Sequence, residues 1–318
     1  MITNTTYTIS AVIPAYNSAA FLPDCINSIR QQTIPLHEII IVDDGSSDNT
    51  EAVVKSLGDD IVYIKQQNQG PAAARNRGIQ KATGDWIAFL DADDQWTSNK
   101  IELQLNCLEK YPELQLIAGD MAETNAQSKV ETPSVLAYHG QRDLFKQLDG
   151  APLKHACASL VQKNFIPTGT VLAKKECLIE AGLFPETIRF GEDLALWAQV
   201  AARHPITCLP DILMLRRRHD SNLTDSNEDM LKGIVQVMRL LKEKCGDVLQ
   251  KQGIQANELL AQACFSLGYW QFHHGQIKQS GQAFRKAWTL KKNFKTGAYL
   301  TLGYLPGGFN NKIFYSRK

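Results

Sequence analysis

The stretch GDWIAFLDADDQW, residues 84–96, joins an apolar run to a group of carboxylates. The five residues 86–90 are apolar, which is typical of a buried strand. The run ends directly in Asp91, Asp93 and Asp94. Like charges at the end of a buried strand are costly unless a cation neutralises them or they lie in a solvated turn that caps the next helix. From this stretch alone both interpretations are open.

The sequence before this stretch alternates short apolar runs with helical patterns. YTISAVIPAY, HEIIIVDD and IVYIKQQ indicate strands, and AAFLPDCINSIRQQ and GPAAARNRGIQKA indicate helices. This alternation predicts an α/β fold with a mostly parallel sheet flanked by helices, as in a Rossmann-like nucleotide-binding half. Ligands of such sheets bind beyond the carboxyl ends of the strands. Asp43 and Asp44 end one predicted strand and Asp91 and Asp93 end another, which predicts a shared site.

The later part of the chain has a different pattern. Residues 120–165 are interpreted as loops and short helices, and ITCLPDILMLRRRHDSN as a strand pair that ends in a basic loop. From about residue 226 the pattern is helical, with a predicted hairpin that turns at Gly275. We therefore expect two domains, 1–225 and 226–318, the second containing one degenerate tetratricopeptide-like unit.

Composition excludes several classes of protein. With 44% apolar and 21% charged residues the chain is typical of a globular protein, and no apolar run approaches the ~20 residues that cross a bilayer. Seven scattered cysteines form no CxxC, so we expect neither a disulfide framework nor a zinc knuckle, and a cytoplasmic location. The net charge of +1 hides a balance of +11 in residues 232–318. This basic part is a candidate for peripheral contact with anionic membrane, or simply carries solvated helix faces; no nucleic acid partner is expected.

Five motifs together resemble the inverting, GT-A-fold glycosyltransferases of family 2. They are PAYN, VDDGSSDNT, GPAAARNRGI, FLDADD and GLFPETIRFGEDLALW, and the resemblance covers roughly residues 8–225. It implies an enzyme that uses a nucleotide-diphosphate sugar together with Mn²⁺ or Mg²⁺. A UDP-sugar is expected, because UDP is the commoner donor nucleotide in related enzymes. The resemblance further implies transfer to a glycan or lipid-linked acceptor in polysaccharide or cell-envelope biosynthesis.

The resemblance also implies roles for the charged residues near the diphosphate. Asp93 is the expected metal ligand, and Asp91 is expected at the ribose or near the metal. A cation of this kind prefers hard oxygen ligands and stabilises the departing diphosphate as a Lewis acid. Arg218 and His219, in the RRRHDSN segment, are expected over the diphosphate, with His219 also a candidate metal ligand.

The nucleoside is expected between the first two strand ends. The resemblance implies that Asp44 accepts a hydrogen bond from the nucleobase and that Asp43 lies near the base or ribose. Pro14 would open the PAYN loop, and Ala15 and Tyr16 would contact the base or ribose.

Three further residues complete the predicted site. Arg75 is expected to reach the base or diphosphate, with a salt bridge to Asp43 or Asp44 as the alternative. Asp193 is expected to remove the proton of the acceptor hydroxyl, and Glu192 to orient the acceptor. The alternative is that both carboxylates only favour a helix N-terminus through its dipole.

Two other enzyme classes lack their expected motifs in this sequence. A haloacid-dehalogenase-like phosphatase would carry its Asp pair near the chain start, and a sugar nucleotidyltransferase would carry a glycine-rich basic loop after its first strand; neither is present. A catalytically inactive sugar-nucleotide-binding scaffold, acting through its helical C-terminal part, is the alternative that stays open.

Overall fold

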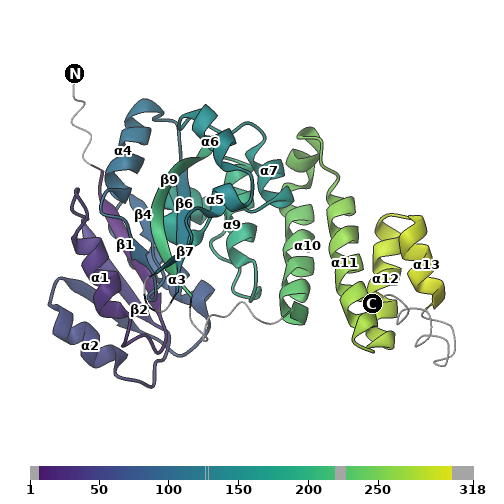
Figure 1. The fold of residues 1–318 in the computed structure, drawn as a ribbon, viewed down its shortest axis with the longest axis horizontal. Coiled ribbons are helices and arrows are strands. Elements are labelled where there is room, and N and C mark those ends of the chain that lie inside the picture. Colours follow the sequence, from purple (N-terminus) through teal and green to yellow (C-terminus); the bar gives the residue numbers. More distant parts are fainter. Residues whose placement is uncertain (1–6, 126, 128, 219–226, 303–318) are drawn as a thin grey trace. The chain divides into compact units, whose positions relative to one another are not determined.

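The computed structural model describes residues 7–125, 127, 129–218 and 227–302. Two compact units are found within them (Figure 1). The first runs to Thr187 and resumes at Glu192 as far as the end of the last strand. The second combines the four residues Ile188–Gly191 with the C-terminal helices. In the described residues no helix combines the length and apolar character that crossing a membrane requires.

The first half of the first unit is the predicted α/β arrangement. Its elements are β1 (Ile9–Ala15), α1 (Leu22–Arg30), β2 (Glu38–Asp43), α2 (Thr50–Leu57), β3 (Ile61–Lys65), α3 (Pro71–Lys81) and β4 (Trp86–Phe89). The strands pair in parallel in the order β3–β2–β1–β4. The inner strands are almost wholly buried, which is why they read as continuous apolar runs. Their carboxyl ends lie at one edge of the sheet.

The second half of this unit continues the same sheet with mixed strand directions. Its elements are β5 (Gln95–Trp96), α4 (Lys100–Lys110), β6 (Leu116–Thr124), β7 (Val130–Thr132), α5 (Val135–Tyr138), α6 (Arg142–Leu148), α7 (Ala156–Gln162), η1 (Thr168–Thr170), β8 (Leu172–Lys174), α8 (Lys175–Glu180), α9 (Glu192–Ala201) and β9 (Ile206–Arg217). β8 is antiparallel to both β4 and β6, whereas β6 and β9 are parallel. The predicted α/β class is confirmed, with parallel pairing concentrated in the first half.

Two predictions of local structure are wrong in this half. Residues 120–165 are not only loops and short helices, because β6 extends through Thr124 and β7 pairs with it. Gly119 and Asp120 interrupt the apolar pattern of β6, which is why the strand was not predicted. A Cβ on Gly119 would lie 2.3 Å from Leu213, and the buried Asp120 accepts the backbone N–H of Leu136. The predicted strand pair is one strand, β9, whose register against β6 shifts across residues 210–211 as a bulge.

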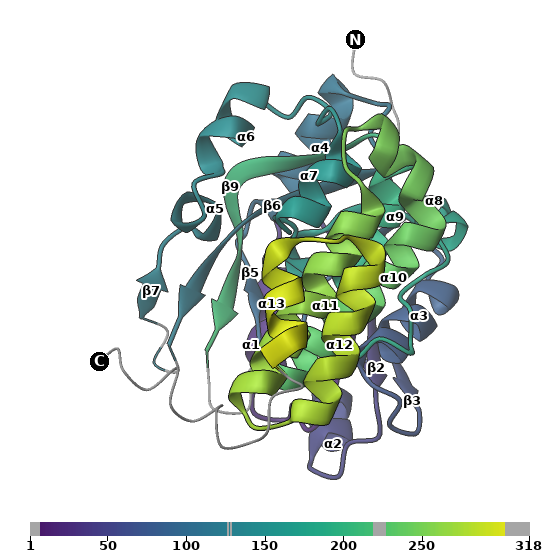
Figure 2. The same cartoon turned by 90° about the vertical axis from the view of Figure 1, so that its right-hand side faces the viewer.

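The second unit is helical, as expected. It contains α10 (Asn227–Lys251), α11 (Ala256–His273), α12 (Ile277–Leu290) and α13 (Phe294–Leu302), shown face-on in Figure 2. Gly275, between α11 and α12, has a φ of 77°, a conformation that favours glycine. Gly268 on α11 lets the ring of Phe284 on α12 approach closely.

The short segment Ile188–Gly191 packs closely against α10. Gly191 has a φ of 85°, and a Cβ there would lie 3.1 Å from Val237. A Cβ on Gly233 would lie 2.5 Å from the carbonyl oxygen of Phe190, closer than real Cβ atoms come. Residue 233 must therefore be glycine if this segment is to keep its position, and the segment is followed directly by α9.

Candidate active site

The acidic turn after β4 is drawn together by backbone contacts. The N–H of Asp94 donates to the carbonyl of Asp91 at 3.0 Å. Asp94 is only 5% exposed, and its carboxylate accepts the backbone N–H of Arg217 at 2.9 Å. Burial, and then repulsion from Asp93 and Asp91, raises the pKa of Asp94 well above its usual value. The turn therefore places two partly exposed carboxylates, Asp91 and Asp93, beside a buried carboxyl group, Asp94, whose neutral form is favoured.

Arg75 lies between this turn and the first residue of α9. From α3, its guanidinium donates to Asp91 at 2.7 Å and to Glu192 at 3.1 Å, and it lies 5.4 Å from the ring centroid of Phe184. The side chain is buried, and its Nε has no hydrogen-bond partner among the residues that the structure describes. Burial lowers the pKa of Arg75, but attraction to Asp91 and Glu192 outweighs it and leaves the pKa raised. The salt bridge considered in the sequence, to Asp43 or Asp44, is not the one formed.

The two carboxylates that open α9 both have pKa values raised above their usual range. Burial raises the pKa of Glu192 to about 7, attraction to Arg75 opposes the rise, and repulsion from Asp193 adds to it. Burial likewise raises the pKa of Asp193, against a 2.7 Å hydrogen bond from the N–H of Leu194. Asn164 donates to the other Asp193 oxygen at 3.4 Å. A carboxylate that titrates near the working pH is suited to accept and release a proton.

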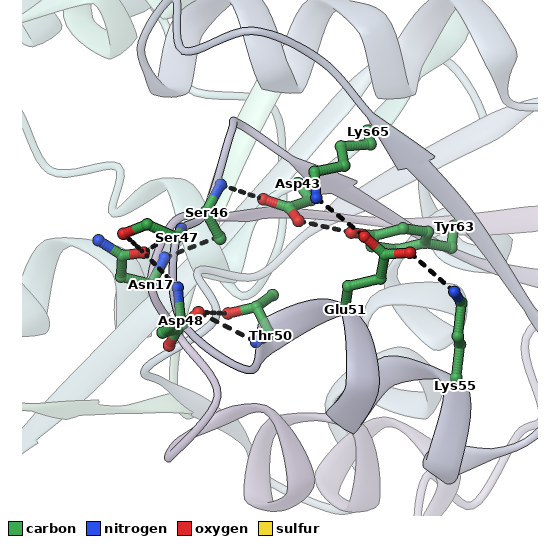
Figure 3. Close-up of polar contacts among 10 residues, drawn as sticks. All are labelled: Asn17, Asp43, Ser46, Ser47, Asp48, Thr50, Glu51, Lys55, Tyr63 and Lys65. Carbon is green, nitrogen blue, oxygen red and sulfur yellow. Dashed lines mark hydrogen bonds and ion pairs between the residues drawn. The ribbon is translucent and has the colours of Figure 1, made fainter.

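Asp43 and Asp44, at the end of β2, are buried and already hydrogen-bonded within the chain. Asp43 accepts the N–H of Ser46 at 2.8 Å and the hydroxyl of Tyr63 (Figure 3). Asp44 accepts the side-chain amide of Gln66 and the backbone N–H groups of residues 69 and 70, all within 2.9 Å. Asp44 therefore fixes the loop that leads into α3.

The PAYN segment is tied to the loop after β2 by Asn17. The side-chain oxygen of Asn17 accepts the backbone N–H of Ser47 at 2.8 Å, and the backbone N–H of Asn17 donates to the hydroxyl of Ser46 at 2.9 Å (Figure 3). Pro14 and Ala15 lie within β1 itself, so the loop opens at Tyr16, two residues later than expected. Tyr16 follows with a 53% exposed side chain, available to a ligand.

The three arginines at the end of β9 lie near two carboxylates: Arg216 and Arg218 near Glu123, and Arg217 near Asp24. Arg216 lies 3.4 Å from Glu123, and Arg217 lies 2.8 Å from Asp24. Arg218 is 62% exposed, with its guanidinium 4.0 Å from Glu123. It is Arg217 whose backbone contacts the acidic turn, through Asp94. His219 lies outside the described residues.

Sequence reasoning did not find several residues of this site. Asn164, next to Asp193, comes from a segment without a recognisable local signal, whereas Phe184, near the guanidinium of Arg75, lies in the motif GLFPETIRFGEDLALW but was given no role there. Gln66, which completes the contacts of Asp44, follows β3 at a position that gave no such hint. Each was missed because it acts through a contact distant in sequence.

The acidic turn fits a divalent cation that is shared with a ligand. In the parts of the chain that the structure describes, no three His, Cys, Asp or Glu side chains form a cage for a metal ion. Asp91 and Asp93 supply hard oxygen atoms on one turn, and Arg75 neutralises only part of their charge. A cation held here would complete its shell with phosphate oxygens and water, as Mg²⁺ commonly does.

Comparison with known proteins identifies the family. The sequence profile of glycosyl transferase family 2 matches residues 10–166. An uncharacterised glycosyltransferase of Rickettsia typhi is 30% identical over 230 residues, which cover 70% of this chain and 68% of that protein. TuaG of Bacillus subtilis, whose name refers to teichuronic acid biosynthesis, is 33% identical over 141 residues, 41% of this chain and 55% of TuaG. The chain spans about 30% of the length of similar glycosyltransferases from other Rickettsia species.

Solved structures resemble the fold over nearly the whole chain. S. aureus TarS in complex with UDP-GlcNAc aligns with a TM-score of 0.67 and 16% identity, over 92% of this chain and 84% of TarS. The mannosyltransferase PcManGT of Pyrobaculum calidifontis, with GDP-Man and Mn²⁺, aligns with a TM-score of 0.61 and 16% identity, over 94% and 80%. The fold is therefore that of the GT-A-type glycosyltransferases. The chain belongs to glycosyltransferase family 2.

Proposed function

We propose that this protein is an inverting glycosyltransferase. It moves a sugar from a nucleotide-diphosphate sugar, most simply a UDP-sugar, to a hydroxyl of a glycan or glycolipid acceptor. UDP-GlcNAc in TarS and GDP-Man with Mn²⁺ in PcManGT support the donor class and a divalent cation. The name of TuaG supports an envelope polysaccharide as acceptor.

The observation that carries this proposal is the double contact of Arg75. One buried guanidinium bonds to Asp91 in the acidic turn and to Glu192 at the start of α9. The donor side and the acceptor side of the predicted site thus share the guanidinium of Arg75, although Asp91 and Glu192 are 101 residues apart in sequence. An arrangement that only capped a helix would not need the arginine of α3.

In the proposed transfer one proton passes to a residue of this chain, and one electron pair leaves with the diphosphate. The acceptor oxygen forms a bond to the anomeric carbon while its proton passes to Asp193, and the bond from that carbon to the diphosphate breaks with its electron pair on the diphosphate. Asp93 and Asp91 would hold a divalent cation, which supplies Lewis-acid stabilisation of the leaving diphosphate when bound. Glu192, held by Arg75, orients the acceptor hydroxyl toward Asp193.

Tyr16 and the end of β9 complete the donor site in this proposal. Tyr16 offers an exposed ring face to the nucleobase beside the loop that Asp43 fixes. Arg218 offers an exposed guanidinium for the diphosphate. Asp44 contributes by fixing the loop before α3 that faces the nucleoside.

The test compares Asp193→Asn with a matched variant, Asp59→Asn, on an exposed turn. Asp193→Asn is expected to reduce transfer by at least about a hundredfold, a typical contribution of a general base, because an amide cannot accept the proton. Donor binding, measured as the rise in melting temperature with nucleotide and Mn²⁺, is expected to persist. Near-normal turnover in Asp193→Asn would reject the base assignment, and a wild-type protein that binds donor without turnover would favour the inactive scaffold.

A further inference from the structure

A groove of about 780 Å³ crosses the face of α11 in the helical unit. Its floor consists of α11 residues at helical spacing, among them Gln262, Phe265, Tyr269 and Trp270. One wall comes from α10, and the other comes from the segment that connects α12 to α13 and from the start of α13. This volume lies in the range of about 300–1,000 Å³ that holds small-molecule ligands.

The lining combines exposed rings with polar side chains. Tyr269 is 41% exposed although its ring lies 5.5 Å from that of Tyr299. Trp270 stacks on His274 at 3.8 Å, which makes a flat aromatic surface. Amide, hydroxyl and carboxylate groups lie beside these rings, from residues that include Gln262, Ser266 and Asn293. Flat rings with planar polar groups at their edges suit a sugar, whose C–H faces are apolar and whose rim is hydroxylated.

The charge of the groove is positive at its α13 side. The Nζ of Lys295 lies 4.8 Å from the ring centroid of Phe265 and is exposed to solvent. Lys291 also lines the groove and pairs with Glu258 at 2.7 Å. The sequence from 232 to 318 carries a balance of +11. A ligand that bears carboxylate or phosphate groups would meet complementary charge here.

We propose that this groove binds an anionic glycan, the acceptor polymer at a point away from the reacting hydroxyl. The proposal rests on the proposed function, because it takes its ligand class from the acceptor. A polymer held by one part of the chain is present at raised effective concentration for the rest of the same chain. The groove would therefore lower KM for long anionic acceptors and leave short acceptors unaffected.

Calorimetric titration of the full chain with an oligogalacturonate of ten residues tests the proposal. Two groove variants, Gln262→Ala and Lys295→Ala, have matched controls in the same unit, Gln282→Ala and Lys278→Ala, which are exposed and lie outside the groove. Each groove variant is expected to weaken binding by roughly three- to tenfold, the controls by less than twofold. Tyr269→Ala should weaken it by about tenfold or more, checked against an unchanged helical circular dichroism spectrum.

Further measurements separate this proposal from its rivals. A neutral maltooligosaccharide of the same length is expected to bind more weakly, and added salt should weaken only the anionic ligand. Tighter binding of a single-stranded RNA decamer, equal effects of groove and control variants, or a dimer that dissociates in Tyr269→Ala would each overturn the proposal. The groove variants should leave the melting-temperature rise with nucleotide and Mn²⁺ intact. If the wild-type protein shows the melting-temperature rise but binds no oligogalacturonate, only the glycan-binding role of the groove is rejected. If it binds oligogalacturonate but shows no melting-temperature rise, the proposed donor is rejected instead.

Discussion

Replacement of Arg75 by methionine should shift the pH dependence of transfer. Methionine fills similar space but removes the cation that bonds to Asp91 and Glu192. Burial raises the pKa of Glu192 to about 7, and attraction to Arg75 opposes a larger rise. A hydrogen bond to a charged group contributes about 1.5–3 kcal/mol, and each pKa unit corresponds to about 1.4 kcal/mol. The pKa of the carboxylate should therefore rise by roughly one to two units.

The sign of the effect on activity follows from which form reacts. Transfer needs deprotonated carboxylates, so kcat/KM rises with pH through their pKa. In Arg75→Met the rise should begin roughly one to two pH units higher than in the wild type. The assay is kcat/KM from pH 5.5 to 10 at saturating donor, with Arg77→Met, an exposed arginine of the same helix, as control.

Stability provides a second measurement on the same variant. Removal of one partner of a buried ion pair costs about 3–5 kcal/mol. For a unit of this size the melting temperature should fall by roughly 6–20 °C. A pH profile that coincides with the wild type, in a variant that remains folded, would refute the coupling of Arg75 to the carboxylates of α9.

Three further substitutions test other parts of the structure. Asp44→Asn should lower the free energy of unfolding by about 2–3 kcal/mol in urea titration, because an amide cannot accept from all of its N–H donors. Burial lowers the pKa of Lys100 well below 10.5 in the folded state. As the pH falls below 10.5, the unfolded state therefore binds more protons than the folded state, and the free energy of unfolding declines. Lys100→Met should flatten this decline between pH 7 and 10. Gly233→Ala should displace Phe190 and reduce kcat by about tenfold without a change in nucleotide binding, whereas Gly246→Ala, with open space around it on the same helix, should raise stability by up to about 1 kcal/mol. An unchanged kcat in Gly233→Ala, an undiminished stability in Asp44→Asn or an unchanged pH slope in Lys100→Met would contradict the respective argument.

The first half of the fold could be predicted from the sequence because its signals are local. Buried parallel strands are continuous apolar runs, and the acidic turn after β4 interrupts one of them abruptly. β6 and β9 were harder to predict because a glycine, a buried aspartate and a proline break their patterns. Those residues are tolerated through contacts between the two strands, and the sequence of either strand alone does not reveal them.

The site shows the same division between local and distant signals. Asp91, Asp93, Glu192 and Asp193 are predicted as site residues from motifs that are continuous in the sequence, and their roles stay predictions. The partners of Arg75 were not predicted: Glu192 lies 117 residues away, and Asp91, 16 residues away, was one of several carboxylates near the same sheet edge. Asp43 and Asp44, the expected partners, accept hydrogen bonds from other donors. Which carboxylate a buried arginine meets is decided by packing, and the sequence offered several of equal charge.

The membership of Ile188–Gly191 in the helical unit limits how this protein can be recombined with its relatives. A cut at residue 225 leaves this segment without α10, against which Gly191 and Phe190 pack. A chimaera that exchanges the C-terminal helices must therefore also exchange these four residues, or keep glycine at position 233. The segment and α10 therefore form one packing unit, although α9 and β9 separate them in the sequence.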